Sequence, residues 1–196
     1  GIDSNKRIIN SLQQGIPAVY EPGFEDLLIK LKSWLEFSID FSRLSSMDCV
    51  FFAQDTETDG SGSVEKLDLL LKQSIPYFKQ DVTIICMSQV PIGYYSKLYQ
   101  MIKHSRPDLN FYLYHMVDTI IMTNAIDRFM NPERIIIGSK DPQARISKAL
   151  DLFLNFFTCQ IFHMSFESAE LTKAAINLYL ANSVAFANTL SDYCEQ

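Results

Sequence analysis

Five short apolar runs alternate along the chain with longer segments of helical spacing. Nearly every residue in these runs is hydrophobic, which is typical of strands buried on both faces. The runs cover residues 49–53, 82–87, 111–114, 134–138 and 160–164. Between them, apolar residues recur every three or four positions over 64–78 and 142–157, as on one side of a helix. The alternation predicts an α/β fold, a parallel sheet with helices on both faces.

The two ends of the sequence carry different patterns. Residues 1–3 have the character of the end of a strand, and a helix that stops near Gly15 is expected to follow. Residues 165–196 contain no glycine or proline and predict one helix of about 30 residues, roughly 45 Å long. That length exceeds one layer of such a domain, so we expect the helix to lead toward a second domain or another subunit. The expected division is an α/β domain over 1–164 and the start of a long helix over 165–196, in a chain that is incomplete at both ends.

Composition and charge narrow the possible functions. Lysine and arginine number 17 against 23 aspartate and glutamate, and the net charge of −6 disfavours nucleic-acid binding because phosphate backbones are repelled. No basic region followed by an apolar stretch opens the sequence, and no uncharged apolar run reaches about 18 residues. We therefore expect a cytoplasmic protein without a membrane partner.

The cysteines and histidines are scattered and predict no metal site. No two cysteines have the close spacing of a zinc motif, and their apolar flanks predict buried, reduced thiols; they are Cys49, Cys86, Cys159 and Cys194. The three histidines are isolated in sequence, and His163 is expected in the core because it lies within an apolar run.

Five short motifs follow one another in a recognisable order. They are Val-Tyr-Glu-Pro-Gly at 19–23, Phe-Phe-Ala-Gln-Asp-Thr-Glu-Thr at 51–58, a segment at 81–93 that ends in Ser-Gln-Val-Pro-Ile-Gly, Asn-Pro-Glu-Arg-Ile-Ile-Ile-Gly at 131–138, and Ser-Ala-Glu-Leu-Thr-Lys-Ala-Ala-Ile-Asn at 168–177. Together they resemble the UDP-glucose and GDP-mannose dehydrogenase family.

The resemblance implies a fold and a chemistry. The fold is most of an NAD-binding Rossmann domain, without its first strand and glycine-rich turn, followed by the start of a central helix through which family members dimerise. The chemistry is oxidation of the C6 hydroxymethyl of a nucleotide sugar to a carboxylate, with two NAD⁺ and a cysteine thiohemiacetal. The implied partners are therefore a UDP-sugar or other nucleotide sugar and a second copy of the chain.

Three residues correspond to cofactor contacts of the family. Asp3 matches the acidic residue that accepts hydrogen bonds from the adenine ribose and favours NAD over NADP. From its type alone it fits a helix N-cap as well. Thr56 and Ser88 follow two of the expected strands, and Ser88 suits either a ribose or phosphate contact or a turn. The seven glycines form no Gly-x-Gly-x-x-Gly turn, so the sequence contains no such pyrophosphate-binding loop.

Four residues correspond to catalytic positions of the family. Lys173 and Asn177 share one helix face, where the family's lysine stabilises an alkoxide and its asparagine positions water or substrate. Thr58 matches a threonine that orders water or substrate near the reacting carbon. Asp118 stands in place of an acid/base glutamate, within a block at 115–123 that departs most from the family pattern. None of the four cysteines matches the nucleophile.

The sequence is compatible with two functions. One is an NAD-dependent nucleotide-sugar 6-dehydrogenase of the UDP-glucose to UDP-glucuronate type, in which this chain alone is inactive. The other is a degenerate, non-catalytic relative that serves as a structural or interaction protein. Substitutions inside the motifs at 55–57 and 116–122 favour the second, because truncation does not produce them.

Overall fold

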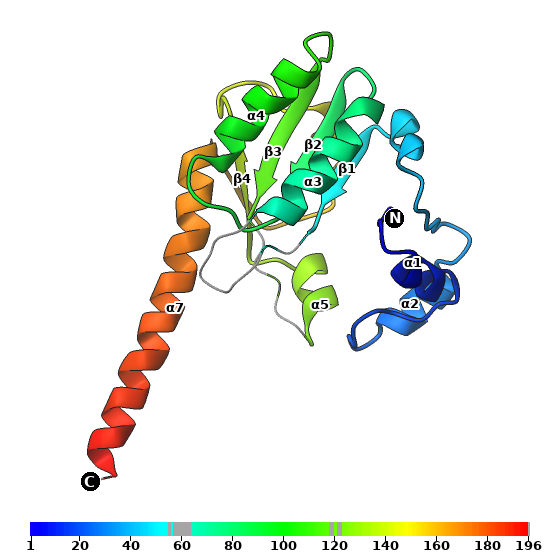
Figure 1. Cartoon of the computed structure of the whole chain (residues 1–196). Helices are drawn as coiled ribbons and strands as arrows, with labels where there is room; N and C mark the ends of the chain where they lie inside the picture. Colours follow the sequence, from blue (N-terminus) through cyan, green and yellow to red (C-terminus); the bar gives the residue numbers. More distant parts are fainter. Residues whose placement is uncertain (55, 57–63, 118–119, 121–122, 196) are drawn as a thin grey trace.

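The computed structural model describes residues 1–54, 56, 64–117, 120 and 123–195, and in this part of the chain a five-stranded sheet forms the centre (Figure 1). The strands lie in chain order: β1 (Cys49–Phe52), β2 (Val82–Cys86), β3 (Phe111–Met116), β4 (Arg134–Ser139) and β5 (Gln160–Ser165). Each begins at the predicted residue and ends within two residues of the predicted end. The apolar runs therefore located the strands correctly.

The direction of β4 and β5 differs from the expected parallel sheet. β1, β2 and β3 are parallel to one another, whereas β4 is antiparallel to β3, with His115 opposite Gly138 and Met116 opposite Ile137. β5 is again parallel to β4. α5 (Ala125–Met130), which precedes β4, lies beyond the carboxyl end of β3, so β4 starts from the edge at which β3 ends (Figure 1).

Two apolar layers cover the sheet. On one face, α3 (Glu65–Ser74) and α4 (Tyr94–Ser105) bury their apolar side chains against β1 and β2. On the other face, α6 (Lys148–Leu154) packs against β3 and β4. β2 is buried along its whole length. The prediction that every strand is buried on both faces is wrong for β5, an edge strand whose Ile161 is 40% exposed.

Two predicted helices are shorter than their apolar patterns. The pattern at 64–78 yields α3 and then a 3₁₀ turn, η2 (Ile75–Tyr77), because Pro76 has no N–H to continue an α-helix. The pattern at 142–157 yields only α6, which begins after Ser147. The Ser147 hydroxyl accepts a hydrogen bond from Leu150 N at 3.2 Å and so caps the helix.

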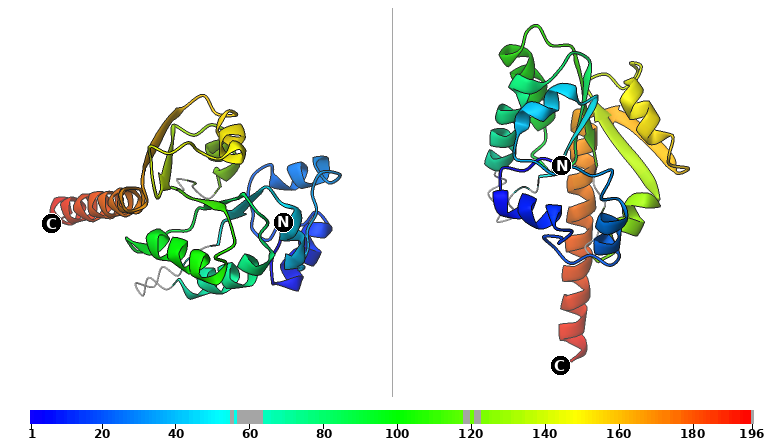
Figure 2. Two further views of the ribbon diagram at one scale, coloured as in Figure 1. Left: turned by 90° about the horizontal axis from the view of Figure 1, so that it is seen from above. Right: turned by 90° about the vertical axis from the view of Figure 1, so that its right-hand side faces the viewer.

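The first 46 residues lie beside β1 and outside the sheet (Figure 2, left). They contain α1 (Lys6–Gln13), α2 (Phe24–Lys30) and the 3₁₀ turn η1 (Phe41–Ser46). α1 ends before Gly15, whose φ of +79° suits the end of a helix. Residues 1–3, expected to end a strand, form only an isolated parallel bridge between Ile2 and Ser38.

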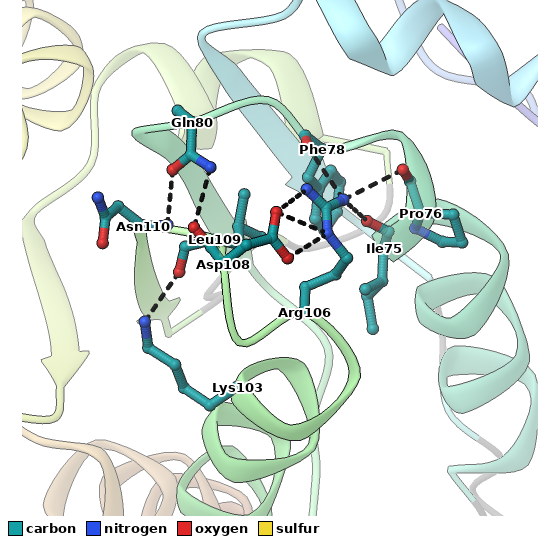
Figure 3. Close-up of polar contacts among 9 residues, drawn as sticks. All are labelled: Ile75, Pro76, Phe78, Gln80, Lys103, Arg106, Asp108, Leu109 and Asn110. Atoms are coloured by element: carbon teal, nitrogen blue, oxygen red, sulfur yellow. Dashed lines mark hydrogen bonds and ion pairs between the residues drawn. The ribbon is translucent and has the colours of Figure 1, made fainter.

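A polar network joins the end of α4 to η2 and to the starts of β2 and β3 (Figure 3). The Arg106 guanidinium donates to Asp108 at 2.9 Å and to three backbone carbonyls, of which Pro76 O is nearest at 3.2 Å. Gln80 donates to Asp108 O and accepts from Asn110 N. The network lies at the amino edge of β2 and β3, so it stabilises the framework at the end opposite the strand carboxyl ends.

The long predicted helix is present as α7 (Phe166–Cys194), with 29 residues, and it extends well beyond the sheet (Figures 1 and 2). Ser165 caps it by accepting from Ser168 N at 3.2 Å. Its first turns pack closely on β4: a Cβ added at Gly138 would lie 2.7 Å from Ala169 Cβ. Among the described helices, none combines the length and apolar content needed to cross a bilayer.

The predicted burial of cysteines and histidines is only partly correct. All four thiols are free, and Cys86 is buried, but Cys194 is exposed because it ends the protruding part of α7. The buried histidine is His115 on β3, whereas His163 is half-buried on the edge strand, with its Nε2 2.8 Å from Ser139 Oγ.

Candidate functional site

The carboxyl ends of β1, β2 and β3 meet at one edge of the sheet, where ligands of open α/β folds bind. β5 runs against β1–β3 and ends close to the carboxyl edge, because Gly138 pairs with His115 of β3 on one side and with Met164 of β5 on the other. α7 follows directly and packs along β4 and β3. The reversal of β4 and β5 thus lets the first half of α7, with Lys173 and Asn177, reach the carboxyl edge.

Gln89, in the turn after β2, links three segments at this edge. Its side-chain Oε1 accepts from Asn177 Nδ2 at 2.8 Å, and its backbone carbonyl accepts from Thr56 Oγ1 at 2.6 Å. The neighbouring Ser88 donates to Gln54 O at 2.5 Å and is only 5% exposed. The structure therefore brings Thr56, Ser88 and Asn177 together.

The two hydroxyls at this edge differ in what they offer a ligand. Both donate their proton to a backbone carbonyl, which leaves the oxygen lone pairs as acceptors. Thr56 is partly exposed, whereas Ser88 is buried. The main effect of the Ser88 hydrogen bond is therefore to hold the ends of β1 and β2 together.

Lys173 and Asn177 line a cavity of about 260 Å³ that also contains Arg128, Glu133 and Arg134. Both arginines pair with Glu133, at 3.4 Å and 3.7 Å, through side chains that are about half exposed. Such exposed pairs contribute little to stability. Among the described residues that line the cavity, three cationic groups face one carboxylate, so this wall is locally positive in a chain of net charge −6. A positive cavity of this kind concentrates anionic ligands.

His115 lies beneath this edge and was missed as a site-related residue. It is 1% exposed, stacks on Tyr95 with ring centroids 4.4 Å apart, and places Nδ1 3.1 Å from Cys86 O. Burial, and to a smaller extent the positive charge of Lys173, lower the pKa of His115 to about 4, although the hydrogen bond with Cys86 O acts in the opposite direction. The imidazole is therefore neutral near pH 7.

Two carboxylates cap helices that lie far from them in sequence. Glu170 of α7 accepts from Gly93 N and Tyr95 N, where α4 begins. Glu21, within the 19–23 motif, accepts from Ala125 N at the first residue of α5 at 2.7 Å. Burial raises the pKa of Glu170, and the hydrogen bonds from the backbone act in the opposite direction. Sequence spacing gave no signal for either contact.

Asp3 lies apart from this group, on a second cavity of about 460 Å³ beside β1 that also reaches Gln54. Its Oδ1 accepts from Asn5 N at 2.6 Å. It is not the N-cap of α1, because Asn5 fills that position and accepts from Arg7 N. Thr58 and Asp118, the other two predicted site residues, lie outside the described part of the chain.

Comparison with known proteins identifies related sequences along the whole chain. Residues 1–157 match the NAD-binding domain of the UDP-glucose/GDP-mannose dehydrogenase family. UDP-glucose 6-dehydrogenase YwqF of Bacillus subtilis is 26% identical over 201 residues, which are 100% of this chain and 45% of the relative. UDP-glucose 6-dehydrogenase TuaD of the same organism is 30% identical over 202 residues, 100% of this chain and 43% of the relative. The chain thus spans less than half the length of these relatives.

Solved structures show the same fold. A UDP-glucose dehydrogenase from Pyrobaculum islandicum superposes with a TM-score of 0.84 at 25% identity, over 97% of this chain and 46% of that chain. A UDP-D-ManNAc dehydrogenase from Pyrococcus horikoshii superposes with a TM-score of 0.88 at 19% identity, over 96% and 46%. The fold expected from the sequence, a Rossmann-like sheet followed by a long helix, is confirmed.

Proposed function

The chain belongs to the UDP-glucose/GDP-mannose dehydrogenase family, and on that basis we propose that it supplies the NAD-side half of a nucleotide-sugar 6-dehydrogenase. The reaction is oxidation of the C6 hydroxymethyl of a nucleotide sugar, of the UDP-glucose type, to a carboxylate. Residues 1–164 form the cofactor-binding part, and 165–196 begin the helix that leads to a dimer contact. The 196-residue chain alone does not turn over substrate in this proposal.

The main support is the shared position of Lys173 and Asn177. They lie one turn apart on one face of α7 and line the same cavity, at the carboxyl edge of the sheet. The positive charge of that cavity suits a substrate that carries a diphosphate. One ligand in this cavity could therefore contact the Lys173 ammonium, the Asn177 amide and the two arginine side chains.

Each residue has a distinct task in the proposed reaction. The Lys173 ammonium stabilises negative charge that develops on the C6 oxygen as the hydroxyl is oxidised. Asn177 donates one N–H to Gln89, so its amide is held in one orientation and its carbonyl oxygen can accept from a substrate hydroxyl or a water. Thr56 presents hydroxyl lone pairs to the cofactor side. By resemblance, Asp118 receives the hydroxyl proton and Thr58 orders water.

NAD fits the described residues at two places. Asp3 sits at the rim of the cavity beside β1, where its carboxylate can take ribose hydroxyls, and Thr56 with the Ser88 turn marks the other end. The sequence contains no Gly-x-Gly-x-x-Gly turn for the pyrophosphate. When bound, NAD⁺ accepts the hydride from C6.

The test is binding of UDP-glucose to the 196-residue chain, followed by NMR chemical-shift changes. Saturable shifts at Lys173 and Asn177 are expected, and Lys173→Ala should abolish them. Lys97→Ala, which removes an exposed ammonium on α4 outside the cavity, should leave them unchanged. Absence of saturable binding by the wild-type chain would overturn the proposal. GDP-mannose in a parallel titration reports which nucleotide is preferred.

A non-catalytic relative is the second candidate, and the changed block at 115–123 favours it. The two candidates differ in ligand binding. A chain that pairs with itself but binds neither UDP-glucose nor NAD⁺ fits the second candidate. NADH formation at 340 nm by the chain alone would contradict both the second candidate and the expected inactivity of the isolated chain.

We also propose that the chain forms a homodimer through the outer half of α7. Large apolar side chains are exposed there, among them Leu178, Leu180, Val184 and Phe186. Apolar side chains gathered on one protruding helix favour association. Sedimentation of the wild type should show a dimer, and Phe186→Glu should shift it toward the monomer. A wild-type monomer at micromolar concentration would contradict the dimer.

A further inference from the structure

Glu170 is a buried acid on α7 that contacts the start of another helix. The residue is 2% exposed. Oε2 accepts from Gly93 N at 2.5 Å and Oε1 accepts from Tyr95 N at 2.8 Å. Burying a carboxylate is costly unless its oxygens are hydrogen-bonded, and both oxygens of Glu170 are. Both carboxylate oxygens must therefore stay within hydrogen-bonding distance of the backbone at the start of α4.

The first turn of α4 depends on this carboxylate. The N-cap of α4 is Gly93, which has no side chain to cap the helix and adopts a φ of +87°. The first N–H groups of a helix lack intrahelical partners and carry partial positive charge. Glu170 satisfies two of these groups from 75 and 77 positions away in the sequence. Glu170 consequently fixes α7 against the first turn of α4.

The same face of α7 carries the candidate site. Glu170, Lys173 and Asn177 are spaced i, i+3 and i+7, which puts all three side chains on one side of the helix. At a rise of about 1.5 Å per residue, Lys173 lies roughly 4.5 Å and Asn177 roughly 10 Å beyond Glu170. Asn177 is tied to Gln89, only four residues before Gly93. Lys173 thus stands between two fixed points that join α7 to residues 89–95.

We propose that Glu170 is a positioning residue: by capping α4 it sets the register of α7, and so the places of Lys173 and Asn177 relative to the Gln89 turn. The importance of those places rests on the proposed function, whereas the register itself is a property of this chain and can be measured without substrate. Glu170 touches no reacting atom in this proposal.

The test compares Glu170→Gln with a matched control, Glu167→Gln. Glu167 lies one turn earlier on α7 and also contacts α4, through Ser96 Oγ, but its side chain is exposed. In Glu170→Gln the amide NH₂ faces a backbone N–H, so one of the two hydrogen bonds is lost. We expect the amide resonances of Gly93 and Tyr95 and the side-chain amide resonance of Asn177 to move together. Glu167→Gln should leave Asn177 in place.

Glu170→Asp distinguishes the effect of the negative charge from that of side-chain length. It replaces Glu170→Gln in the test if that variant does not fold. It keeps the charge but is one methylene shorter, so α7 must shift for the carboxylate to reach α4. The Asn177 resonance should move in this variant too. If Gly93 and Tyr95 respond while Asn177 and hydrogen exchange over residues 173–180 do not, Glu170 only caps α4 and the proposal is overturned.

Substrate binding supplies an independent measurement. UDP-glucose affinity should fall about tenfold in Glu170→Gln, a loss of about 1.4 kcal/mol, and less than about twofold in Glu167→Gln. If the wild type binds no UDP-glucose, the proposed function fails. The positioning of α7 by Glu170 is then still tested by the Asn177 resonance. If the wild type binds and Glu170→Gln binds equally well, only the positioning role fails.

Discussion

The close approach of α7 to β4 at Gly138 makes this glycine sensitive to any added side chain. A Cβ built there would lie 2.7 Å from Ala169 Cβ and 3.3 Å from Phe166 Cα. Carbon atoms in contact normally lie about 3.5–4.0 Å apart. Gly138→Ala therefore requires α7 to retreat by about 1 Å. The backbone does not oppose the change, because Gly138 is not among the glycines with positive φ.

The expected cost follows from this overlap. Overpacking of a well-packed core costs about 1–3 kcal/mol, and we expect about 2 kcal/mol for Gly138→Ala. For a chain of this size that loss lowers Tm by about 4–8 °C. Urea denaturation should show a lower midpoint with an unchanged m-value. The retreat of α7 should also weaken the hydrogen bond between Asn177 and Gln89, which NMR detects at the Asn177 side-chain amide.

A double-mutant cycle isolates the contact between the two β-carbons. Ala169→Gly removes the methyl group that the new side chain meets, and by itself it costs about 1 kcal/mol from helix propensity. In combination with Gly138→Ala it should recover part of the loss, with a coupling energy of about 1 kcal/mol or more. Gly138→Ala with wild-type stability, or a strictly additive double mutant, would refute the steric explanation.

Three further predictions concern other parts of the fold. His115 is buried and neutral, with a pKa lowered to about 4 mainly by burial, so stability should fall as pH drops from 6.5 toward 4. His115→Gln should remove up to about 3 kcal/mol of that fall, and His104→Gln, at an exposed site, should not. Cys194 is exposed and should react with a maleimide at once, whereas burial raises the pKa of the Cys86 thiol and should block its reaction until the chain unfolds; equal rates would contradict this. Ser147→Ala removes the cap of α6 and the partner of a buried hydroxyl on β2, and should cost about 2 kcal/mol in urea denaturation; a change below 0.5 kcal/mol, about the noise of a surface substitution, would contradict it.

Local sequence patterns predicted the elements well and their directions poorly. Continuous apolar runs placed the start of all five strands, because burial on both faces leaves a strong local signal. The reversal of β4 was missed, because a run of apolar residues is the same in either direction. α6 is shorter than predicted because Ser147 caps it, whereas the apolar pattern already begins at residue 142.

The site was predicted in part for the same reason. The i, i+4 spacing of Lys173 and Asn177 is local and could be read directly from the sequence. The contacts that hold this part of α7 in place could not be: Asn177 binds Gln89 across 88 positions, and Glu170 binds Tyr95 across 75. The charged wall formed by Arg128 and Arg134 likewise depends on how the segment before β4 folds against α7.

These long separations determine when the site forms during folding. The hydrogen bond between Asn177 and Gln89 spans 88 positions, and the contact of Glu170 with Tyr95 spans 75. During synthesis, β1 to β5 leave the ribosome before the first half of α7 does. Until α7 follows, α4 therefore has no Glu170 cap and the ends of β1 to β3 have no contact with Asn177. Contacts of such sequence separation are slow to close. The carboxyl edge is therefore assembled last, and the arrival of α7 is the step that completes it.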